Sequence, residues 1–232
     1  NKILSKFAKK IFVAYDNLNQ FFNPSKIILT GNPVRKDITA TLPAKQAAAS
    51  FFGLSENKKT ILIIGGSLGA RTINEAIEKN LPSFTQNGFQ ILWQTGKIYY
   101  DGIIERTKNA DLSSVKILQF IKEMNMAYSI ADVIISRAGA LSISELCIVG
   151  KPTVLIPSPN VSEEKKKKNA MALVNKEAAI LLRDNEAKDK LGTVLLNLMK
   201  DETTLNVLSA NIKTLAKTNA ATEIVQNITK DK

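Results

Sequence analysis

TILIIGGSLGA, residues 60–70, joins a short run of apolar, mostly β-branched residues to a glycine-rich turn. The apolar residues around and after the turn recur at helical spacing, at Ala70, Ile73, Ile77 and Leu81. This stretch therefore predicts a buried strand, a tight turn and an amphipathic helix in direct succession.

The turn at residues 65–69 is a candidate phosphate-binding loop. Glycines let the backbone approach an anion closely, and free amides at a helix start, aided by the helix dipole, favour a diphosphate. The pattern is neither a full dinucleotide fingerprint nor a Walker loop, because no Gly-Lys-Ser/Thr follows it. A glycine-rich turn can also be purely structural, and the pattern alone leaves both interpretations open.

The alternation of strand and helix continues along the chain. Further short apolar runs predict strands at residues 89–96, 115–120, 131–139, 152–159 and 178–184, with amphipathic helical segments between them. Nearly continuous apolar runs are typical of parallel strands that helices cover on both faces. The sequence thus predicts an α/β fold, a Rossmann-like doubly wound parallel sheet whose ligands bind at the carboxyl ends of the strands.

The first 30 residues do not follow this rhythm. They predict a helix, a short strand at residues 11–15 and a loop, and a proline-containing joint at Gly31, Asn32 and Pro33 then leads to a helical segment, Lys45–Phe52. We expect residues 1–30 to close a different domain, residues 31–218 to form the Rossmann-like domain, and residues 219–232 to form a helical tail.

Composition limits the possible chemistry. The 32 basic and 21 acidic residues give a net charge of +11, which indicates an anionic partner, although dispersed charge also serves solubility. An aromatic content of 6% argues against nucleic acid, because few rings are available to stack on bases. The chain has no histidine and a single cysteine, Cys147, which we expect in the core. No apolar run is long enough to span a membrane, so a soluble, cytosolic protein is expected.

The segment SRAGALSISEL, residues 136–146, repeats the strand-turn-helix arrangement and contains a candidate ligand-binding carboxylate. Ser142 and Glu145 have the spacing of a capping box, in which Glu145 would fold back on its own helix start. Alternatively, Glu145 lies one turn into the helix and accepts hydrogen bonds from two vicinal ribose hydroxyls. Spacing alone does not decide between these two roles.

Five motifs taken together resemble the MurG family in order and spacing, over nearly the whole chain. These are GNPVR at 31–35, GGSLGAR at 65–71, FIKEM at 120–124, SRAGALSISEL at 136–146 and GKPTVLIPSP at 150–159. The surrounding residues, including NAMALVNKEAAI at 169–180, resemble the Bacteroidetes members of that family. The resemblance implies the C-terminal half of a GT-B type glycosyltransferase, in which two Rossmann-like domains face each other across a cleft.

The resemblance also implies an activity. MurG enzymes transfer N-acetylglucosamine from UDP-GlcNAc to lipid-linked muramoyl-pentapeptide, which converts lipid I to lipid II in peptidoglycan synthesis. This chain would supply the half that binds UDP-GlcNAc, the donor substrate, and needs no cofactor or metal. The acceptor and the catalytic base would belong to an N-terminal domain that the chain lacks, so the chain alone is expected to bind donor without transferring sugar. A peripheral position on the inner face of the cell membrane is implied as well.

Site residues follow from the same motifs. The resemblance implies that Arg35 contacts the donor and that Ser67, with Gly66 and Gly69, contacts the phosphates. It places Ile121 against the uracil, with its backbone reading the base edge, and Glu145 at the ribose. The diphosphate would be lined by the start of the following helix, at Ala140, Leu141, Ser142, Ile143 and Ser144.

One departure affects the sugar. The family usually has His-Gln where this chain has Lys165 and Lys166, so Lys166 takes the place of a glutamine that contacts the donor sugar. A lysine donates hydrogen bonds but cannot accept them, which puts recognition of the sugar hydroxyls in question. The lysine run 165–168 by itself is also typical of a solvated helix face.

Two other functions remain to be weighed. The first is a non-catalytic nucleotide-sugar-binding module that acts with a separate acceptor-binding chain. The second is a dinucleotide-dependent oxidoreductase, which would need an acidic residue at the end of the second strand. That strand ends in Gln94 and Thr95 instead.

Overall fold

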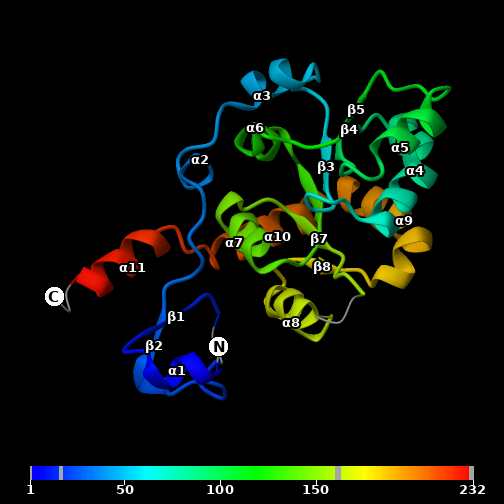
Figure 1. Cartoon of the computed structure of the whole chain (residues 1–232). Helices are drawn as coiled ribbons and strands as arrows, with labels where there is room; N and C mark the ends of the chain where they lie inside the picture. Colours follow the sequence, from blue (N-terminus) through cyan, green and yellow to red (C-terminus); the bar gives the residue numbers. More distant parts are fainter. Residues whose placement is uncertain (1, 16–17, 160–162, 230–232) are drawn as a thin grey trace.

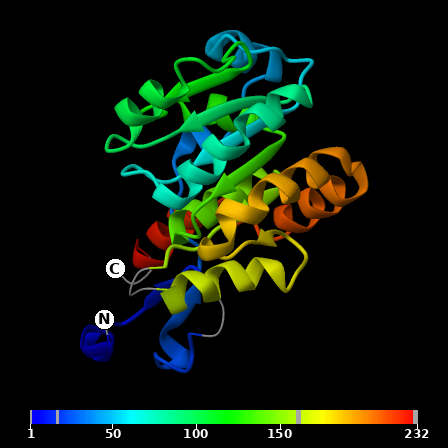
Figure 2. The same cartoon turned by 90° about the vertical axis from the view of Figure 1, so that its right-hand side faces the viewer.

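A computed structural model describes residues 2–15, 18–159 and 163–229, with the backbone alone for residue 2 and residues 163–168. A six-stranded parallel sheet forms its centre, with helices on both faces (Figures 1 and 2). Its strands are β3 (Thr60–Ile64), β4 (Gln90–Gln94), β5 (Val115–Leu118), β6 (Val133–Ser136), β7 (Thr153–Leu155) and β8 (Ile180–Leu181). Their spatial order is β5-β4-β3-β6-β7-β8, which confirms the predicted doubly wound, Rossmann-like sheet.

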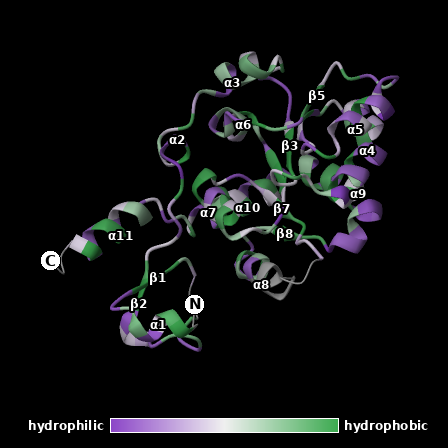
Figure 3. Cartoon of the chain, viewed as in Figure 1, coloured by the Kyte–Doolittle hydropathy of each residue, from purple (hydrophilic) through white to green (hydrophobic). Residues whose placement is uncertain are grey.

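Each face of the sheet has its own apolar core, because successive side chains of a strand point to opposite faces. Ile61, Ile63 and Trp93 pack on one side with α4 (Arg71–Gln86), α5 (Tyr100–Thr107) and α9 (Asp184–Lys200). Leu62 and Leu92 pack on the other side, and the helices there are α2 (Lys36–Thr39), α3 (Lys45–Phe52), α6 (Met124–Ile130), α7 (Ala140–Val149) and α8 (Glu163–Val174). Figure 3 shows the apolar strands enclosed by helices with hydrophilic outer sides.

Some element bounds differ from the sequence prediction. Helix α4 continues seven residues beyond the expected Lys79, to Gln86, with Pro82 inside it. Proline removes one helical hydrogen bond, but the last turns bury Leu81 and Phe84, and this burial offsets the loss. The predicted strand at 178–184 contracts to Ile180–Leu181, because it lies at the sheet edge and pairs only with β7.

The N-terminal segment forms a small separate sheet. It contains α1 (Lys2–Phe7), β1 (Ile11–Val13), a 3-10 helix at Pro24–Lys26 and β2 (Ile27–Leu29), with β1 and β2 parallel. The last two helices are α10 (Glu202–Lys213) and α11 (Ala220–Thr229), and Lys10 Nζ donates to Asn227 O of α11 over 2.7 Å. The domain limits at residues 30 and 218 stay a prediction.

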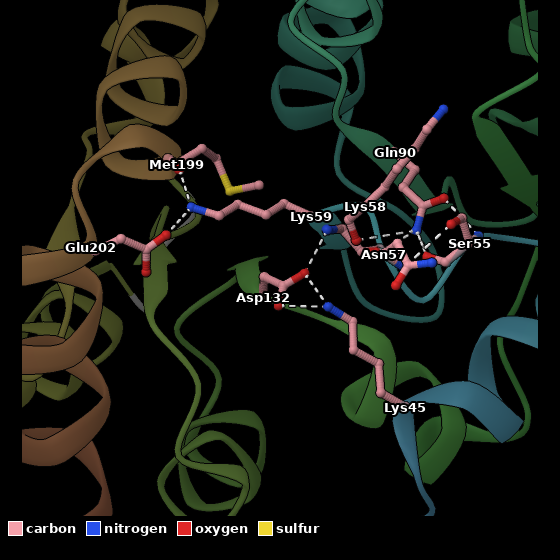
Figure 4. A network of polar contacts seen from close by, with 10 residues as sticks. Lys45, Ser55, Asn57, Lys58, Lys59, Gln90, Asp132, Met199 and Glu202 are labelled. Carbon is pink, nitrogen blue, oxygen red and sulfur yellow. Dashed lines mark hydrogen bonds and ion pairs between the residues drawn. The ribbon is translucent and has the colours of Figure 1, made fainter.

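A polar network closes the amino-terminal edge of the large sheet (Figure 4). Asp132, which precedes β6, accepts from the Thr60 amide at 2.7 Å and from Lys45 Nζ at 3.0 Å. Gln90, the first residue of β4, accepts from the Ser55 amide at 2.9 Å and donates to Thr60 Oγ1 at 2.9 Å. These contacts tie the strand starts to the preceding loop and to α3, at the edge opposite to the expected ligand site.

Among the described residues, no helix combines the length and the apolar character that crossing a bilayer requires.

Candidate functional site

The candidate site lies where the strand order reverses. β3 and β6 are neighbours, with Ile64 paired to Ser136, yet the chain leaves β3 toward β4 on one side and leaves β6 toward β7 on the other. The loops at their carboxyl ends therefore diverge and leave room for a ligand. The two motifs singled out in the sequence, the turn at 65–70 and the segment 137–142, follow these two strands directly.

The turn after β3 depends on its glycines. Gly66 and Gly69 have φ of +88° and +81°, values that side chains rarely tolerate, and the Gly69 amide closes the turn on Gly66 O at 3.0 Å. A Cβ on Gly66 would meet no atom within 4 Å in the part of the chain that the structure describes, so this side of the turn has room for a ligand. Ser67 is exposed. Helix α4 begins at Arg71, so the turn precedes the helix instead of forming its first residues.

The end of β4 supports this turn from behind. A Cβ on Gly69 would lie 2.1 Å from Thr95 O, and one on Gly96 would lie 2.2 Å from Gly69 N. Asn74 Nδ2 donates to the same Thr95 carbonyl over 2.9 Å, and Trp93 Nε1 donates to Asn74 Oδ1 over 3.0 Å. Backbone contact this close requires glycine at both positions.

Helix α7 begins at the same edge with amides that no side chain of the described residues caps. Gly139 is its N-cap and has no side-chain cap, so the amides of residues 140–142, namely Ala140, Leu141 and Ser142, are the ones without a helical partner. The Ile143 amide already donates to Gly139 O at 2.9 Å, and the Ile143 side chain is buried in the core. Of the five residues expected to line the diphosphate, 140–144, only residues 140–142 therefore have backbone amides outside the helical hydrogen bonds of α7.

The capping-box interpretation of Ser142 and Glu145 is wrong, because Gly139 is the N-cap. The Glu145 carboxylate instead accepts a hydrogen bond of 2.9 Å from Tyr128 Oη. Burial raises the pKa of Glu145, while this hydrogen bond and the charge of Arg35 act in the opposite direction. Burial, with the adjacent carboxylate, likewise raises the pKa of Tyr128 well above its usual value. The Glu145 carboxyl therefore accepts a hydrogen bond from Tyr128 and loses its proton at a higher pH than an exposed glutamate does.

The joint after β2 brings Arg35 to Glu145. Arg35 is half-exposed and pairs with Asp37 at 2.9 Å, and its charge lowers the pKa values of both Tyr128 and Glu145. The resemblance implied that Arg35 and Glu145 serve one site. In the structure Arg35 is close enough to influence the Glu145 carboxyl electrostatically, and a shared site stays a prediction. Tyr128 was missed because its helix, α6, is linked to α7 only through tertiary packing.

Two further polar side chains fasten the joint to α7. Asn32 Nδ2 donates to Ser144 Oγ at 3.0 Å, and Tyr15 Oη donates to Ala140 O at 2.8 Å. Ser144 Oγ in turn donates to Ala140 O at 3.1 Å. Burial raises the pKa of Tyr15 to about 12. Ser144 is thus engaged in holding the joint, and the only sequence signal for this contact was the presence of Asn32 in the motif GNPVR.

Ile121 is more enclosed than the sequence suggested. Its side chain is 2% exposed, and its amide donates to Gln94 Oε1 at 2.8 Å. A base edge at this position would therefore meet the Ile121 carbonyl or compete with Gln94 for the amide. Cys147 is buried, as expected, and burial raises its thiol pKa to about 11. Lys166 belongs to the residues whose side chains lie outside the described part of the chain.

Arg137, directly after β6, is a cation at the same edge whose charge is already compensated. Its guanidinium donates to Ile156 O and Pro157 O at 3.1 Å each and forms an ion pair with Asp184. Asp184 also accepts from Thr72 Oγ1 at 2.8 Å. This group joins the ends of β6 and β7 to α4 and α9, and so keeps the strand ends in place.

A doubly wound sheet with a glycine-rich turn at its switch point is typical of nucleotide-binding folds, and comparison with known proteins narrows the class to the Rossmann-like C-terminal half of a GT-B type glycosyltransferase. The pattern of the glycosyltransferase family 28 C-terminal domain matches residues 60–228, and the chain belongs to this family. Its resemblance to the MurG proteins is confirmed by curated relatives and by a solved structure.

Two relatives are 50% identical to the chain, over 230 and 228 residues, one from Parabacteroides distasonis and one from Cytophaga hutchinsonii. Both are named UDP-N-acetylglucosamine–N-acetylmuramyl-(pentapeptide) pyrophosphoryl-undecaprenol N-acetylglucosamine transferase. The matches cover 99% and 98% of this chain but 62% and 61% of the relatives. The chain therefore spans about three fifths of their length.

Solved structures agree on the fold. The crystal structure of Acinetobacter baumannii MurG superposes with a TM-score of 0.73 at 26% identity, over 98% of this chain and 62% of that one. The UDP co-structure of S. aureus MnaA has a TM-score of 0.69 at 14% identity, over 98% of this chain and 62% of that one, and supports the fold alone.

Proposed function

We propose that this chain is the donor-binding part of an enzyme that transfers N-acetylglucosamine from UDP-GlcNAc to lipid-linked muramoyl-pentapeptide in peptidoglycan synthesis. One observation carries the proposal: the Gly66 turn, the free amides of residues 140–142 and the Glu145 carboxylate occupy one edge of the sheet, in a chain half identical to relatives named for this reaction. The amides suit a diphosphate, and the carboxylate suits a ribose diol.

The same geometry supports a role in the transfer step. In an inverting transfer, the acceptor hydroxyl attacks the anomeric carbon while UDP leaves with the bonding electron pair. The departing diphosphate gains negative charge, and the amides of the turn at 65–69 and of residues 140–142 would stabilise it. The base that accepts the hydroxyl proton, and the acceptor-binding surface, would come from the part of the protein that the relatives have beyond this match.

Three further contacts belong to this proposal. Arg35 lies near Glu145 and would bind the donor, and the Ile121 backbone would read the uracil edge. Lys166 would meet the sugar, where its ammonium can donate to a hydroxyl but not accept from one. If so, Lys166→Gln should strengthen the binding of UDP-GlcNAc and leave that of UDP unchanged, which calorimetry with both ligands would measure.

Calorimetric titration of the 232-residue chain tests the site. We expect UDP and UDP-GlcNAc to bind and NAD not to bind, with UDP-glucose as a control for the sugar. Glu145→Ala should weaken UDP binding by roughly 10- to 100-fold, because it removes hydrogen bonds to a charged acceptor. Ser67→Ala should weaken it by roughly tenfold or more, because the Ser67 hydroxyl would donate to a charged phosphate.

The control is Glu202→Ala, at the start of α10, where Glu202 pairs with Lys59 at the opposite edge of the sheet. This variant should bind UDP like the parent chain. Unchanged UDP affinity in both Glu145→Ala and Ser67→Ala would refute the assignment of the site.

We also propose a peripheral position at the cytoplasmic face of the membrane. The net charge of +11 favours anionic lipid headgroups, and the relatives' name specifies a polyprenyl-linked acceptor.

A further inference from the structure

Gln94, the last residue of β4, has a side chain that lies between two loops of the candidate site. Its Nε2 donates to Gly66 O in the turn after β3, over 3.1 Å. Its Oε1 accepts from the Ile121 amide in the loop after β5, over 2.8 Å. Gln94 is 3% exposed, and the two ends of its amide bond to these two loops. The bond to the Ile121 amide is buried, and the bond to Gly66 O is partly buried.

The sheet explains why this position reaches both loops. Gln94 pairs with Ile64 of β3 on one side and with Leu118 of β5 on the other. Its side chain therefore stands between the exits of the two neighbouring strands. Those exits lead to the turn that would hold the diphosphate and to the residue that would meet the base.

The chemistry of the two bonds requires a neutral amide. One partner is a carbonyl and needs a donor, while the other is an amide and needs an acceptor. A carboxylate would lose the bond to Gly66 O and would place a negative charge beside a bound diphosphate. An apolar side chain would leave the Ile121 amide without this partner and would release Gly66 O from the end of β4.

We propose that Gln94 is a positioning residue of the nucleotide site. It holds the turn at 65–69 and the backbone of Ile121 at the separation that a uridine diphosphate spans. Gln94 does not itself touch the nucleotide in this arrangement, and its effect passes through Gly66 and Ile121. The inference rests on the proposed function, because it presumes that UDP binds at this edge.

The same strand supplies a matched control. Gln90, four residues earlier, is 2% exposed and also uses both ends of its amide, with Ser55 and Thr60 (Figure 4). Its bonds lie at the amino-terminal edge of the sheet, away from the nucleotide. Replacing either glutamine with methionine removes a buried amide of the same size from the same strand. Gln90 makes four hydrogen bonds and Gln94 makes two, so the control variant carries at least the same structural cost at a different location.

The test compares UDP affinity and thermal stability in Gln94→Met, Gln90→Met and the parent chain. We expect Gln90→Met to lose at least as much Tm as Gln94→Met, because Gln90 makes more hydrogen bonds. We expect Gln94→Met to bind UDP at least tenfold more weakly and Gln90→Met to bind within twofold of the parent chain. The preference for UDP over CDP should also fall in Gln94→Met, because the Ile121 backbone is no longer held, and a purely structural role would not change this preference.

The outcomes separate the two proposals. If the parent chain does not bind UDP, the proposed function fails. If the parent chain binds UDP and Gln94→Met binds it as tightly as Gln90→Met does, with the UDP preference intact, the role of Gln94 is overturned. If Gln94→Met does not fold, Gln94→Asn and Gln90→Asn replace the pair. The shorter arm misses the same partners, and the same comparison applies.

Discussion

The partly buried carboxyl of Glu145 lowers the stability of the folded chain at neutral pH. Burial raises the pKa of its carboxyl, so the folded chain holds the proton more tightly than the unfolded chain does. Stability therefore falls as the pH rises through the interval between the unfolded and folded pKa values, and the loss persists above it. Such a group is more often kept for function than for folding.

Glu145→Gln should accordingly stabilise the chain and weaken ligand binding. At pH 8 we expect the free energy of unfolding to rise by up to about 1 kcal/mol, a modest figure because the group is partly exposed and screened by solvent. The gain should vanish below about pH 4, where both chains are neutral at this position. UDP affinity should fall about tenfold, because a neutral amide oxygen is a weaker acceptor. Urea unfolding at the two pH values, with calorimetry, would measure both effects, and destabilisation at pH 8 would contradict the account.

Tyr128→Phe should move the pH dependence of donor binding. The Tyr128 hydroxyl lowers the pKa of Glu145, so removing it raises that pKa further. Binding of UDP-GlcNAc should weaken as the pH falls through the pKa of Glu145, and in the variant this loss should begin at higher pH. UDP-GlcNAc suits the measurement because both of its phosphates are esterified and do not titrate in this range. An identical pH profile in Tyr128→Phe and the parent chain would exclude the coupling.

At this scale the sequence supplied candidate residues and not their contacts. The resemblance to the MurG motifs implied donor-binding roles for Arg35, Ser67 and Glu145, and these roles stay predictions. The sequence did not reveal the contact between Tyr128 and Glu145, nor that between Gln94 and Ile121, since these depend on how separate elements pack. It also left Ser142 and Glu145 open to a capping role that Gly139 fills.

At the scale of the elements, the turn between β3 and α4 contains two glycines that are required for different reasons. Gly66 has a positive φ in open space, and Gly69 has a positive φ and a close backbone neighbour. Gly66→Ala should cost about 1 kcal/mol of stability, because φ is positive but the surrounding space is open. Gly69→Ala should cost about 3 kcal/mol or more, because its Cβ would collide with Thr95 O. Urea unfolding of the two variants would measure the difference, and equal losses would contradict the packing described.

Gly88, in the turn after α4, provides the control for ligand binding. It also has positive φ and open space around its would-be Cβ, but it lies before β4, at the opposite edge of the sheet. Gly66→Ala and Gly88→Ala should lose similar stability, while only Gly66→Ala, whose new methyl group faces the expected diphosphate, should bind UDP more weakly. Equal UDP affinities in the two variants would place the phosphate elsewhere.

The elements themselves were largely predictable. The helix at Lys45–Phe52 has the expected bounds, and each predicted strand of the main sheet is present. The predictions were wrong at the ends of helices and strands, because tertiary burial determines where an element stops. Helix α4 continues past Pro82 and buries Phe84, and β8 has two residues. The four-residue helix α2 was not anticipated, since only Ile38 of that helix is buried.

For the whole molecule, charge predicts a salt-sensitive attachment to lipid. With a net charge of +11, we expect the chain to cosediment with vesicles that contain phosphatidylglycerol at low ionic strength and to leave them near 0.5 M salt, where the screening length falls to roughly 4 Å. Neutral phosphatidylcholine vesicles are the control and should retain little protein. Binding that persists at high salt would show that apolar contacts, and not charge, hold the chain at the surface.

The fold as a whole was predictable from the alternation of strands and helices, because a parallel sheet needs crossovers and the crossovers need helices. The relation of residues 1–30 to the rest was not, because it depends on single contacts such as that between Lys10 and Asn227. Sequence periodicity reports on neighbouring residues and does not predict contacts between residues more than 200 positions apart.

The polypeptide passes twice between the small sheet and the large one, and the two passages touch: a Cβ on Gly31 would lie 2.6 Å from Cβ of Lys217. A nick at residues 31–35 would leave residues 1–30 attached by non-covalent contacts, among them the hydrogen bonds from Lys10 to Asn227 and from Tyr15 to Ala140. A nicked chain would migrate as two bands under denaturing conditions, and its elution under native conditions would measure whether these contacts suffice to hold the small sheet in place.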